Sequence, residues 1–323
     1  MATEFLETSN PSEALIDELT AVSPTNPFYT QNYIEAQRSL GFAPWAFIIR
    51  ENGRTKAGCT AFMKAGRLSR SLEITSLPIL DDQDFFWKRL LHFCNKQRVT
   101  RLKVETFASP FTQIPSLNGE TNRRERSEFL LELQKPELQG KLSKNHARNI
   151  KRGRKAGIYV QRTSDQKACQ AHAKLIAKSM IRRGDRGERV PENEPADAFW
   201  AYTHSGAGVL FQAFLDETVL SSVLVLFAEK GAYYHSAGNN PEGMAFGASH
   251  FLIQEIANVL RDQSFQVFNL GGSDHSNPGL SRFKAGFGAR VVDLEEADFF
   301  LCSRIRLKVI KTFHRLYDRI KIR

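Results

Sequence analysis

The run AYYHSAGNNPEGMAFGASHFLIQEIANVL (residues 232–260) leads to LGGSDHSNPGLSRFKAGFG (residues 270–288), and this segment decides the fold. Residues 232–236 are rich in aromatic side chains and stop at a Gly-Asn-Asn-Pro turn, which predicts a strand. Helical spacing of the apolar residues predicts a helix over 248–261, and the short apolar run 265–270 predicts a buried strand. The order strand, loop, helix, strand predicts two parallel strands joined by a right-handed crossover.

Two glycines precede the expected helix and would let the backbone approach a ligand closely. A helix N-terminus offers unpaired N–H groups and the positive end of the helix dipole, which suits a phosphate or a developing oxyanion. Gly243 and Gly247 would lie beside that N-terminus, which starts with Ala248 and Ser249. The alternative is that both glycines serve turn geometry alone.

Several runs resemble the C-terminal half of the FemAB-like acyltransferases, which are built from GNAT (N-acetyltransferase-like) domains and include peptidoglycan-bridge-type aminoacyltransferases and BioF2-like acetyltransferase domains. These runs are GASHFLIQEI (247–256), FNLGG (268–272) and GLSRFKAGFGARVV (279–292). Upstream, LSKNHARNIKRGRKAG (142–157) is similar to the basic connector of the same proteins. The resemblance implies an α+β chain of two tandem GNAT-like domains, each a mixed, mostly antiparallel sheet flanked by helices.

The order of predicted elements repeats along the chain and divides it into three parts. We expect an N-terminal GNAT-like domain over 1–135, a basic connector helix over 136–160 and a C-terminal GNAT-like domain over 161–323. A cleft lined by the connector is expected between the domains. Helices are predicted at 11–21, 31–40, 81–98, 164–183 and 194–204, and further strands at 45–50, 57–64, 68–76, 102–107, 129–133, 209–214 and 219–227.

Composition is that of an ordinary globular chain. With 323 residues, 41% of them hydrophobic and 25% charged, the chain is long enough for two domains. No stretch approaches the ~18 apolar residues of a membrane span, and the acidic N-terminus predicts no secretory signal. The four cysteines have neither metal-ligand nor redox spacing, which predicts buried thiols in a reducing compartment. We therefore expect a cytoplasmic protein.

The net charge of +10 is concentrated in two segments. Residues 141–162 carry eight Lys/Arg and no acidic residue, and residues 303–323 carry eight against one acid. In the second segment an apolar stripe at helical spacing predicts a C-terminal helix. That helix would pack on its own domain or lie on an anionic membrane surface, a possible peripheral contact. The stripe consists of Ile305, Val309, Phe313, Leu316 and Ile320.

The basic connector has the spacing of a helix with cations along one face. Ser143 is a suitable N-cap for it. Like charges at i, i+4 repel, so such a face suits an anion: the phosphates of tRNA, of a nucleotide-linked acceptor or of a lipid pyrophosphate. The alternative is a solvated linker helix. The candidate phosphate-binding residues are Lys144, Arg148, Lys151 and Arg152, with Lys155 next along the face, and Arg282 from the C-terminal run.

No Ser-His-Asp arrangement is discernible, and direct attack by an amine on an activated acyl group fits the resemblance. Lys284 is the first candidate for an essential residue, because its charge could neutralise the oxyanion or the leaving group. Phe283 would pack against the lysine stem, and the ammonium is expected to face the N-terminus of the helix over 248–261. The alternative is an exposed helix lysine.

Other titratable residues are weaker candidates. Asp274 and Glu242 are candidate general bases, although most loop carboxylates only bind backbone or water. His235, His250 and His275 are too irregularly placed for a metal site, so no metal is expected.

Two donors fit the resemblance, and neither would be bound permanently. Coenzyme A-using GNAT proteins usually show Gln/Arg-x-x-Gly-x-Gly/Ala, whereas this chain has Met244 and Ser249 at the outer positions around Gly247. This departure favours aminoacyl-tRNA, the donor of the best-known FemAB relatives, over acyl-CoA. The donor-binding candidates are Gly243, Gly247, Ala248, Ser249 and Phe283. The acceptor would be the amine of a peptide, an amino acid or a cell-wall precursor. A non-catalytic RNA- or anion-binding module is the alternative of another class.

Overall fold

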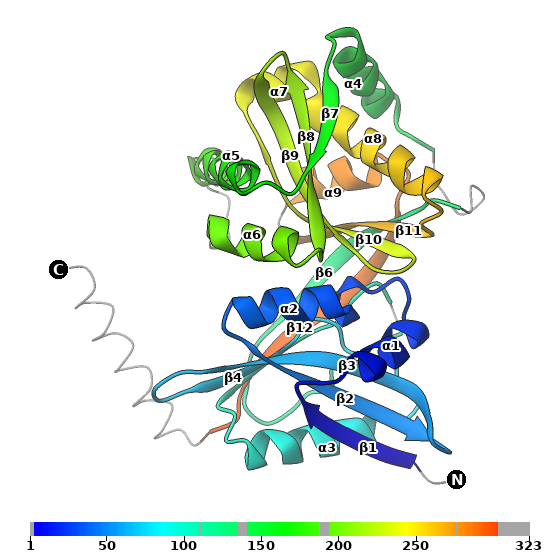
Figure 1. Ribbon diagram of the computed structural model, residues 1–323, viewed down its shortest axis with the longest axis vertical. Coiled ribbons are helices and arrows are strands. Elements are labelled where there is room, and N and C mark those ends of the chain that lie inside the picture. The colour runs from blue at the N-terminus through cyan, green and yellow to red at the C-terminus, as the bar shows by residue number, and fades with distance from the viewer. Residues whose placement is uncertain are drawn as a thin grey trace, which may run out of the picture. The chain divides into compact units, whose positions relative to one another are not determined.

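The structure is a computed structural model that describes residues 3–109, 111–134, 141–185, 187, 194–274 and 277–302. Within these residues the chain forms two compact units. Among the described residues, unit 1 lies within 3–15, 41–125 and 294–302, and unit 2 lies within 16–40 and 126–293. Figure 1 labels the elements of both.

Unit 1 is a mixed, mostly antiparallel sheet with the strand order β1-β2-β3-β4-β5-β12. All of its neighbouring strands are antiparallel except β4 and β5, which are parallel and joined by a helix. An Asn52-Gly53 turn with positive φ at both residues joins β2 to β3. The elements are β1 (Thr3–Ser9), β2 (Ala43–Glu51), β3 (Arg54–Ala65), β4 (Arg70–Ile74), α3 (Gln83–Lys96), β5 (Arg101–Glu105) and β12 (Arg290–Phe300).

Unit 2 has the strand order β6-β11-β10-β9-β8-β7, and only β10 and β11 are parallel. Its strands are β6 (Glu120–Glu132), β7 (Tyr159–Thr163), β8 (Gly208–Leu215), β9 (Thr218–Phe227), β10 (Gly231–Asn239) and β11 (Val267–Asp274). Its helices are α1 (Glu13–Val22), which begins in unit 1, η1 (Pro27–Tyr29), α2 (Gln31–Ser39), α4 (Lys144–Lys155), α5 (Gln166–Asp185), α6 (Ala196–His204), α7 (Pro241–Phe246), α8 (Ala248–Asp262) and α9 (Pro278–Ala285).

Helices cover both faces of the unit 2 sheet (Figure 1). Val223 and Val225 of β9 belong to a large apolar core with the buried face of α8. Ser222 lies between these valines along β9, so its side chain is on the opposite face of the sheet. There it hydrogen-bonds with His172 of α5. The period of two along the strand thus assigns α8 to one face and α5 to the other.

The two units repeat one pairing pattern, which confirms the tandem GNAT-like α+β fold. Along each sheet the strands pair antiparallel three times, then once in parallel, then once more antiparallel. The last strand of each sheet comes from the other half of the sequence: β12 pairs with β5, and β6 pairs with β11. The units are therefore not contiguous segments.

The predicted boundaries near residues 135 and 160 divide the chain into contiguous segments, whereas each compact unit combines segments that are far apart in the sequence. Residues 16–40 pack in unit 2, β6 passes from unit 1 into unit 2 after Glu125, and β12 passes from unit 2 into unit 1 after Asp293. The connector helix α4 is part of unit 2. Whether the predicted segments fold independently stays a prediction.

Most predicted elements are present, and the differences have physical reasons. The parallel pair β10–β11 and its crossover helix α8 are confirmed. The sequence prediction missed β1, β7 and β12, whose mixed or polar side chains follow from exposed edges or half-buried faces. It also took α7 for a loop, because a helix this short has no apolar periodicity. The predicted C-terminal helix lies outside the described residues.

Candidate active site

Lys284 is buried in α9, with 5% of its surface exposed, so it is not an exposed helix lysine. Asn277 caps the helix by accepting a hydrogen bond from Leu280 N, and Pro278 occupies the first helical position. The Lys284 ammonium donates to Gly272 O at 2.7 Å and lies 5.5 Å from the centre of the Tyr234 ring. Gly272 O is its hydrogen-bond acceptor within the described residues, so two N–H donors remain for a ligand.

A left-handed glycine brings the β11 backbone to the ammonium. Gly271 has φ of 76°, and a Cβ there would lie 3.4 Å from Lys284 Nζ and 3.0 Å from Tyr234 O. Asn269 fixes this turn because its Oδ1 accepts from Gly271 N at 2.8 Å. Its Nδ2 donates to the fully buried Glu128 at 2.9 Å. The Gly-Gly turn is therefore held by a side-chain network from β6 and β11.

Burial lowers the pKa of Lys284 to about 7, because the interior disfavours the charged form. The Glu128 carboxylate opposes this shift, and the Arg126 guanidinium adds to it. Arg126 also forms an ion pair with Glu128, with Nη1 and Oε1 2.7 Å apart. Because this pKa is close to neutral pH, small changes around Lys284 alter the fraction of the lysine that is charged. Shifted pKa values of this kind are common at catalytic sites.

Lys284 lies where the two parallel strands stop pairing. β10 and β11 are in register over Gly231–Tyr233 and Val267–Asn269. Beyond these residues β10 has an irregularity between Tyr234 and Ser236, and β11 has one between Asn269 and Gly272. The end of this pairing therefore lies beside the Lys284 ammonium, a donor suited to the oxygen of an acyl carbonyl.

Phe283, rather than Lys284, contacts the N-terminal turn of α8. The ring centre of Phe283 lies 4.9 Å from that of His250. On the same side, His146 of α4 binds Phe283 O through Nε2 at 2.7 Å and Ser143 Oγ through Nδ1 at 2.8 Å. The His146 ring fills the space beside Gly286, where a Cβ would lie 2.2 Å from it. Since His146 holds α9 to α4, it positions the helix that carries Lys284.

The glycine segment before α8 is packed against α4. A Cβ on Gly247, which has φ of 73°, would lie 2.8 Å from Asn149 O, and one on Gly243 would lie 2.5 Å from Leu220 O. The segment also uses its own N–H groups: Gly243 donates to Asn240 Oδ1, and Gly247 donates to Met244 O. Close packing and helix termination account for both glycines, and their predicted role in donor binding stays a prediction.

The other predicted donor-binding and catalytic residues are spread over unit 2. Ala248 is buried in the first turn of α8, and Ser249 Oγ donates to Asn239 Oδ1 at 2.6 Å. Glu242 is exposed in the first turn of α7, where a carboxylate stabilises the helix dipole. Asp274 ends β11 opposite Arg126, and its side chain lies outside the described residues.

The basic connector is a helix capped as predicted, since Ser143 Oγ accepts from His146 N at 3.2 Å. Its buried face is formed by His146, Ile150 and Gly153. The predicted cations have different hydrogen-bond partners, and their binding of phosphate stays a prediction. Lys144 is exposed, Arg148 donates to Asn145 Oδ1, Arg152 donates to Ala245 O at the end of α7, and Arg282 of α9 donates to Pro278 O.

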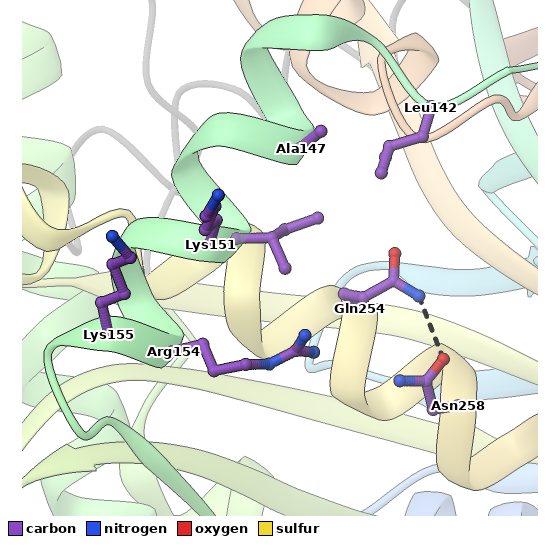
Figure 2. A pocket seen from close by; sticks show the side chains of 8 residues that line it. Leu142, Ala147, Lys151, Arg154, Lys155, Gln254 and Asn258 are labelled. Carbon is purple, nitrogen blue, oxygen red and sulfur yellow. Dashed lines mark hydrogen bonds between the residues drawn. The ribbon is translucent and has the colours of Figure 1, made fainter.

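A groove of about 580 Å³ lies between α4 and α8 (Figure 2). Lys151, Arg154 and Lys155 provide its basic edge, and Arg154 also pairs with Glu255 at 3.4 Å. Figure 2 shows Gln254 donating to Asn258 on the α8 side. The lining residues are Leu142, Ala147, Ile150, Lys151, Arg154, Lys155, Gln254 and Asn258. Of the predicted phosphate-binding residues, Lys151 and Lys155 lie here.

The sequence reasoning missed the residues that hold Lys284 in place. Glu128 and Asn269 are strand residues with no motif around them, and only the buried network shows their role. His146 lies in the basic connector, and a histidine among so many Lys and Arg residues was the one sequence feature that could have indicated its packed position. Arg154, an exposed cation that lines the groove, was also not among the predicted residues.

Among the described residues no His, Cys, Asp or Glu cluster could hold a metal ion. Cys59, Cys94 and Cys169 are buried free thiols, and burial raises the pKa of each. In the same part of the chain no helix is long and apolar enough to cross a membrane.

Comparison with known proteins agrees with this geometry. The family model described as "Acetyltransferase (GNAT) domain" matches residues 140–285. This match contains α4, the β10–α8–β11 crossover and α9 with Lys284. Residues 140–285 are therefore similar to a GNAT acetyltransferase domain. No curated protein matches the chain.

Solved structures extend the likeness over nearly the whole chain. FemX is similar with a TM-score of 0.64 at 12% identity, over 92% of this chain and 97% of that one. A tandem GNAT protein from the clavulanic acid biosynthesis pathway has a TM-score of 0.56 at 11% identity, over 94% and 99%. L-PGS from Bacillus licheniformis has a TM-score of 0.55 at 12% identity, over 94% and 96%. At such identities the likeness shows the fold, and with the family model it supports a GNAT-fold acyltransferase.

Proposed function

We propose that this protein transfers an aminoacyl group from aminoacyl-tRNA to an amine. The observation that carries the acyl-transfer step is Lys284, a buried ammonium that has one hydrogen-bond acceptor among the described residues and lies where β10 and β11 stop pairing. An aminoacyl ester is already reactive, so positioning and oxyanion stabilisation would supply most of the rate. Lys284 would donate to the carbonyl oxygen as negative charge develops on it.

The packing of α4 supports tRNA as the donor. Asn149 lies against Gly247, and Gly153 lies so close to α8 that an added Cβ would be 2.9 Å from Phe251 Cβ. This part of the segment before α8 is therefore covered by protein. A coenzyme A pyrophosphate would bind to the N–H groups of such a segment only if they were open, so the packing argues against that donor. The cations at the groove and on the exposed face of α4 suit a polyanion that binds from outside.

Acyl-CoA is the second candidate donor, and two observations favour it. The family model is described as an acetyltransferase domain. The similar tandem GNAT structure is described as being without AcCoA, which names that donor for the other protein. On either donor the chemistry at Lys284 would be the same, because both present a reactive acyl carbon.

The acceptor supplies the nucleophilic amine. A peptide, an amino acid or a cell-wall precursor of the peptidoglycan type would each provide one, and the FemAB-like resemblance favours the last. We expect the reaction to take place in the cytoplasm, where tRNA is charged.

Donor identity is tested by presenting both donors to the full chain in parallel. Filter binding and transfer of radiolabel to amine acceptors would be measured with bulk aminoacyl-tRNA and with acetyl-CoA. We expect binding and transfer with aminoacyl-tRNA. Transfer from acetyl-CoA alone would show that the donor is acyl-CoA rather than aminoacyl-tRNA. Binding of tRNA without transfer would favour the non-catalytic RNA-binding module.

A further inference from the structure

His235 lies at the β10 irregularity, next to the end of the β10–β11 pair. It has no role in the acyl-transfer step described above. The register of β10 with β9 shifts between Tyr234 and Ser236, so His235 is the extra residue. Bulges redirect side chains and are frequent beside active sites. The His235 side chain is 16% exposed, so it is held in place and still accessible to a ligand.

Glu194 fixes the orientation of this histidine. Oε2 of Glu194 lies 3.1 Å from Nε2 of His235. A carboxylate accepts hydrogen bonds, so Nε2 carries the proton and Nδ1 carries the lone pair. The ring is also held by aromatic contacts, 4.9 Å from the Tyr202 ring centre and 6.3 Å from that of Tyr233. A histidine with one nitrogen bound to a carboxylate is the usual arrangement of a general base.

Tyr233 connects this histidine to the lysine site. Its Cε2 atom lies 3.8 Å from the position of a Cβ on Gly271, and Lys284 Nζ lies 3.4 Å from the same point. The Tyr233 ring therefore reaches from the left-handed glycine to His235. Tyr233 thus lies between the His235 ring and the Gly271 backbone beside Lys284.

We propose that His235, oriented by Glu194, accepts the proton of the attacking amine. This assignment rests on the proposed acyl transfer. The acceptor enters as an ammonium and gives one proton to His235 Nδ1, which later releases it to solvent. The neutral nitrogen attacks the acyl carbon, a C–N bond forms and the C–O bond to the ribose breaks. The second nitrogen proton passes to the leaving ribose oxygen, and Lys284 stabilises the oxyanion between these steps.

The alternative is that His235 and Glu194 have a purely structural role. Their ion pair would then only hold the segment before α6 against β10. The two roles separate when amines of different basicity are compared. Glycinamide has an α-amino group that is largely protonated at neutral pH and needs a base. Hydroxylamine is unprotonated there, so it attacks without one.

The test compares His235→Asn, Glu194→Gln and wild type in single-turnover transfer at neutral pH, with the donor that wild type uses. We expect His235→Asn to slow transfer to glycinamide by about a hundredfold and to leave the catalysed reaction of hydroxylamine within about threefold. Added imidazole should restore part of the glycinamide rate. Glu194→Gln should slow glycinamide about tenfold. His204→Asn, an exposed histidine of α6, is the matched control and should change neither rate.

Equal loss with both amines, or loss with neither, would overturn the assignment of His235. If wild type transfers from neither aminoacyl-tRNA nor acetyl-CoA to either amine, the proposed function fails, and the assignment fails with it. The two failures are distinguishable because only the second is seen in wild type.

Discussion

Lys284 lies in an environment where a charged lysine costs stability. Its side chain is buried, and its ammonium hydrogen-bonds to a single carbonyl oxygen within the described residues. A buried charge of this kind costs stability unless it is fully paired. Proteins retain such groups where a reaction uses them.

Replacing Lys284 with methionine should stabilise the protein. The pKa of about 7 in the folded state lies below the usual lysine value, so the unfolded chain binds more protons between these pH values. The cost is therefore present at and below neutral pH and disappears as the pH rises toward the usual lysine value. We expect Lys284→Met to raise the free energy of unfolding by up to about 4 kcal/mol near neutral pH.

Urea unfolding across a pH series measures this difference. The gap between variant and wild type should shrink in alkaline solution. A destabilised Lys284→Met variant would show that the lysine is a net structural contact instead.

Glu128 should set the pH range over which Lys284 is charged. Its carboxylate raises the lysine pKa, so Glu128→Gln should lower that pKa further. If the ammonium is the active form, the rate falls as the pH rises through that pKa, and the variant should lose activity at lower pH than wild type. A pH–rate profile of acyl transfer measures the shift.

Glu132→Gln is the control for this experiment, because it removes a β6 carboxylate that pairs with Arg290 instead. Its profile should match that of wild type. Since Glu128 is buried, a thermal melt must show that the Gln variant is folded. An unchanged alkaline limb in a folded variant would remove Lys284 from the pH dependence.

At the residue scale, the sequence could single out Lys284 but not its partners. The RFKAGFG run carries the family resemblance, whereas Asn269 and Glu128 meet only after β6 and β11 pair. No local pattern encodes a contact between residues 128 and 269. The same reason hid the His235–Glu194 pair, which joins β10 to the segment before α6.

At the scale of elements, α4 has two functions in unit 2. One face packs on α7 and α8 through Gly153 and Ile150, and its N-terminal turn holds α9 through Ser143 and His146. The other face carries cations to solvent and to the groove (Figure 2). A ligand bound to α4 would therefore contact the same helix that positions Lys284.

The α4–α8 contact requires a glycine. A Cβ on Gly153 would lie 2.9 Å from Phe251 Cβ, so Gly153→Ala should destabilise the protein by about 1–3 kcal/mol although alanine is the better helix former. Gly184→Ala is the matched control, since a Cβ at this helical position meets nothing within 4 Å. It should be neutral or stabilising by up to about 1 kcal/mol. Equal effects of the two changes in chemical denaturation would argue against close helix packing here.

The groove cations should contribute to binding of a polyanion. Replacing Lys151 and Lys155 with glutamine should weaken tRNA binding and reduce the slope of log K against log salt by about two. Lys174 and Lys178 form an exposed pair with the same spacing on α5 and serve as the control. Filter binding over a salt series measures both slopes. Identical slopes for the two double variants would leave α4 as a solvated helix.

Element types were largely predictable because apolar periodicity is strong in α8, α3 and the central strands. The β10–α8–β11 crossover followed from element order alone, since parallel strands need a connection of that kind. Edge strands such as β7 carry mixed side chains, so periodicity did not reveal them. The close approach of α4 to Gly247 could not be read from a sequence in which glycine also serves turns.

At the scale of the whole molecule, the two units share one pairing pattern and exchange their last strands. The repeat was predictable from the order of elements, whereas the exchange was not, because β6 and β12 each follow their own half in the sequence. The residues that form the site are in unit 2, and the GNAT family match falls there too. The unit with the β10–β11 divergence is thus the one expected to carry the reaction.

Single-turnover transfer by Lys284→Met with saturating donor tests the central claim, that this ammonium stabilises the transition state of acyl transfer. Loss of one preorganised oxyanion partner typically costs ~3 kcal/mol, so the rate should fall about a hundredfold while donor binding changes little. Lys284→Arg should restore only part of the rate, because its planar guanidinium places the charge differently. Full activity in a folded Lys284→Met variant would contradict the claim.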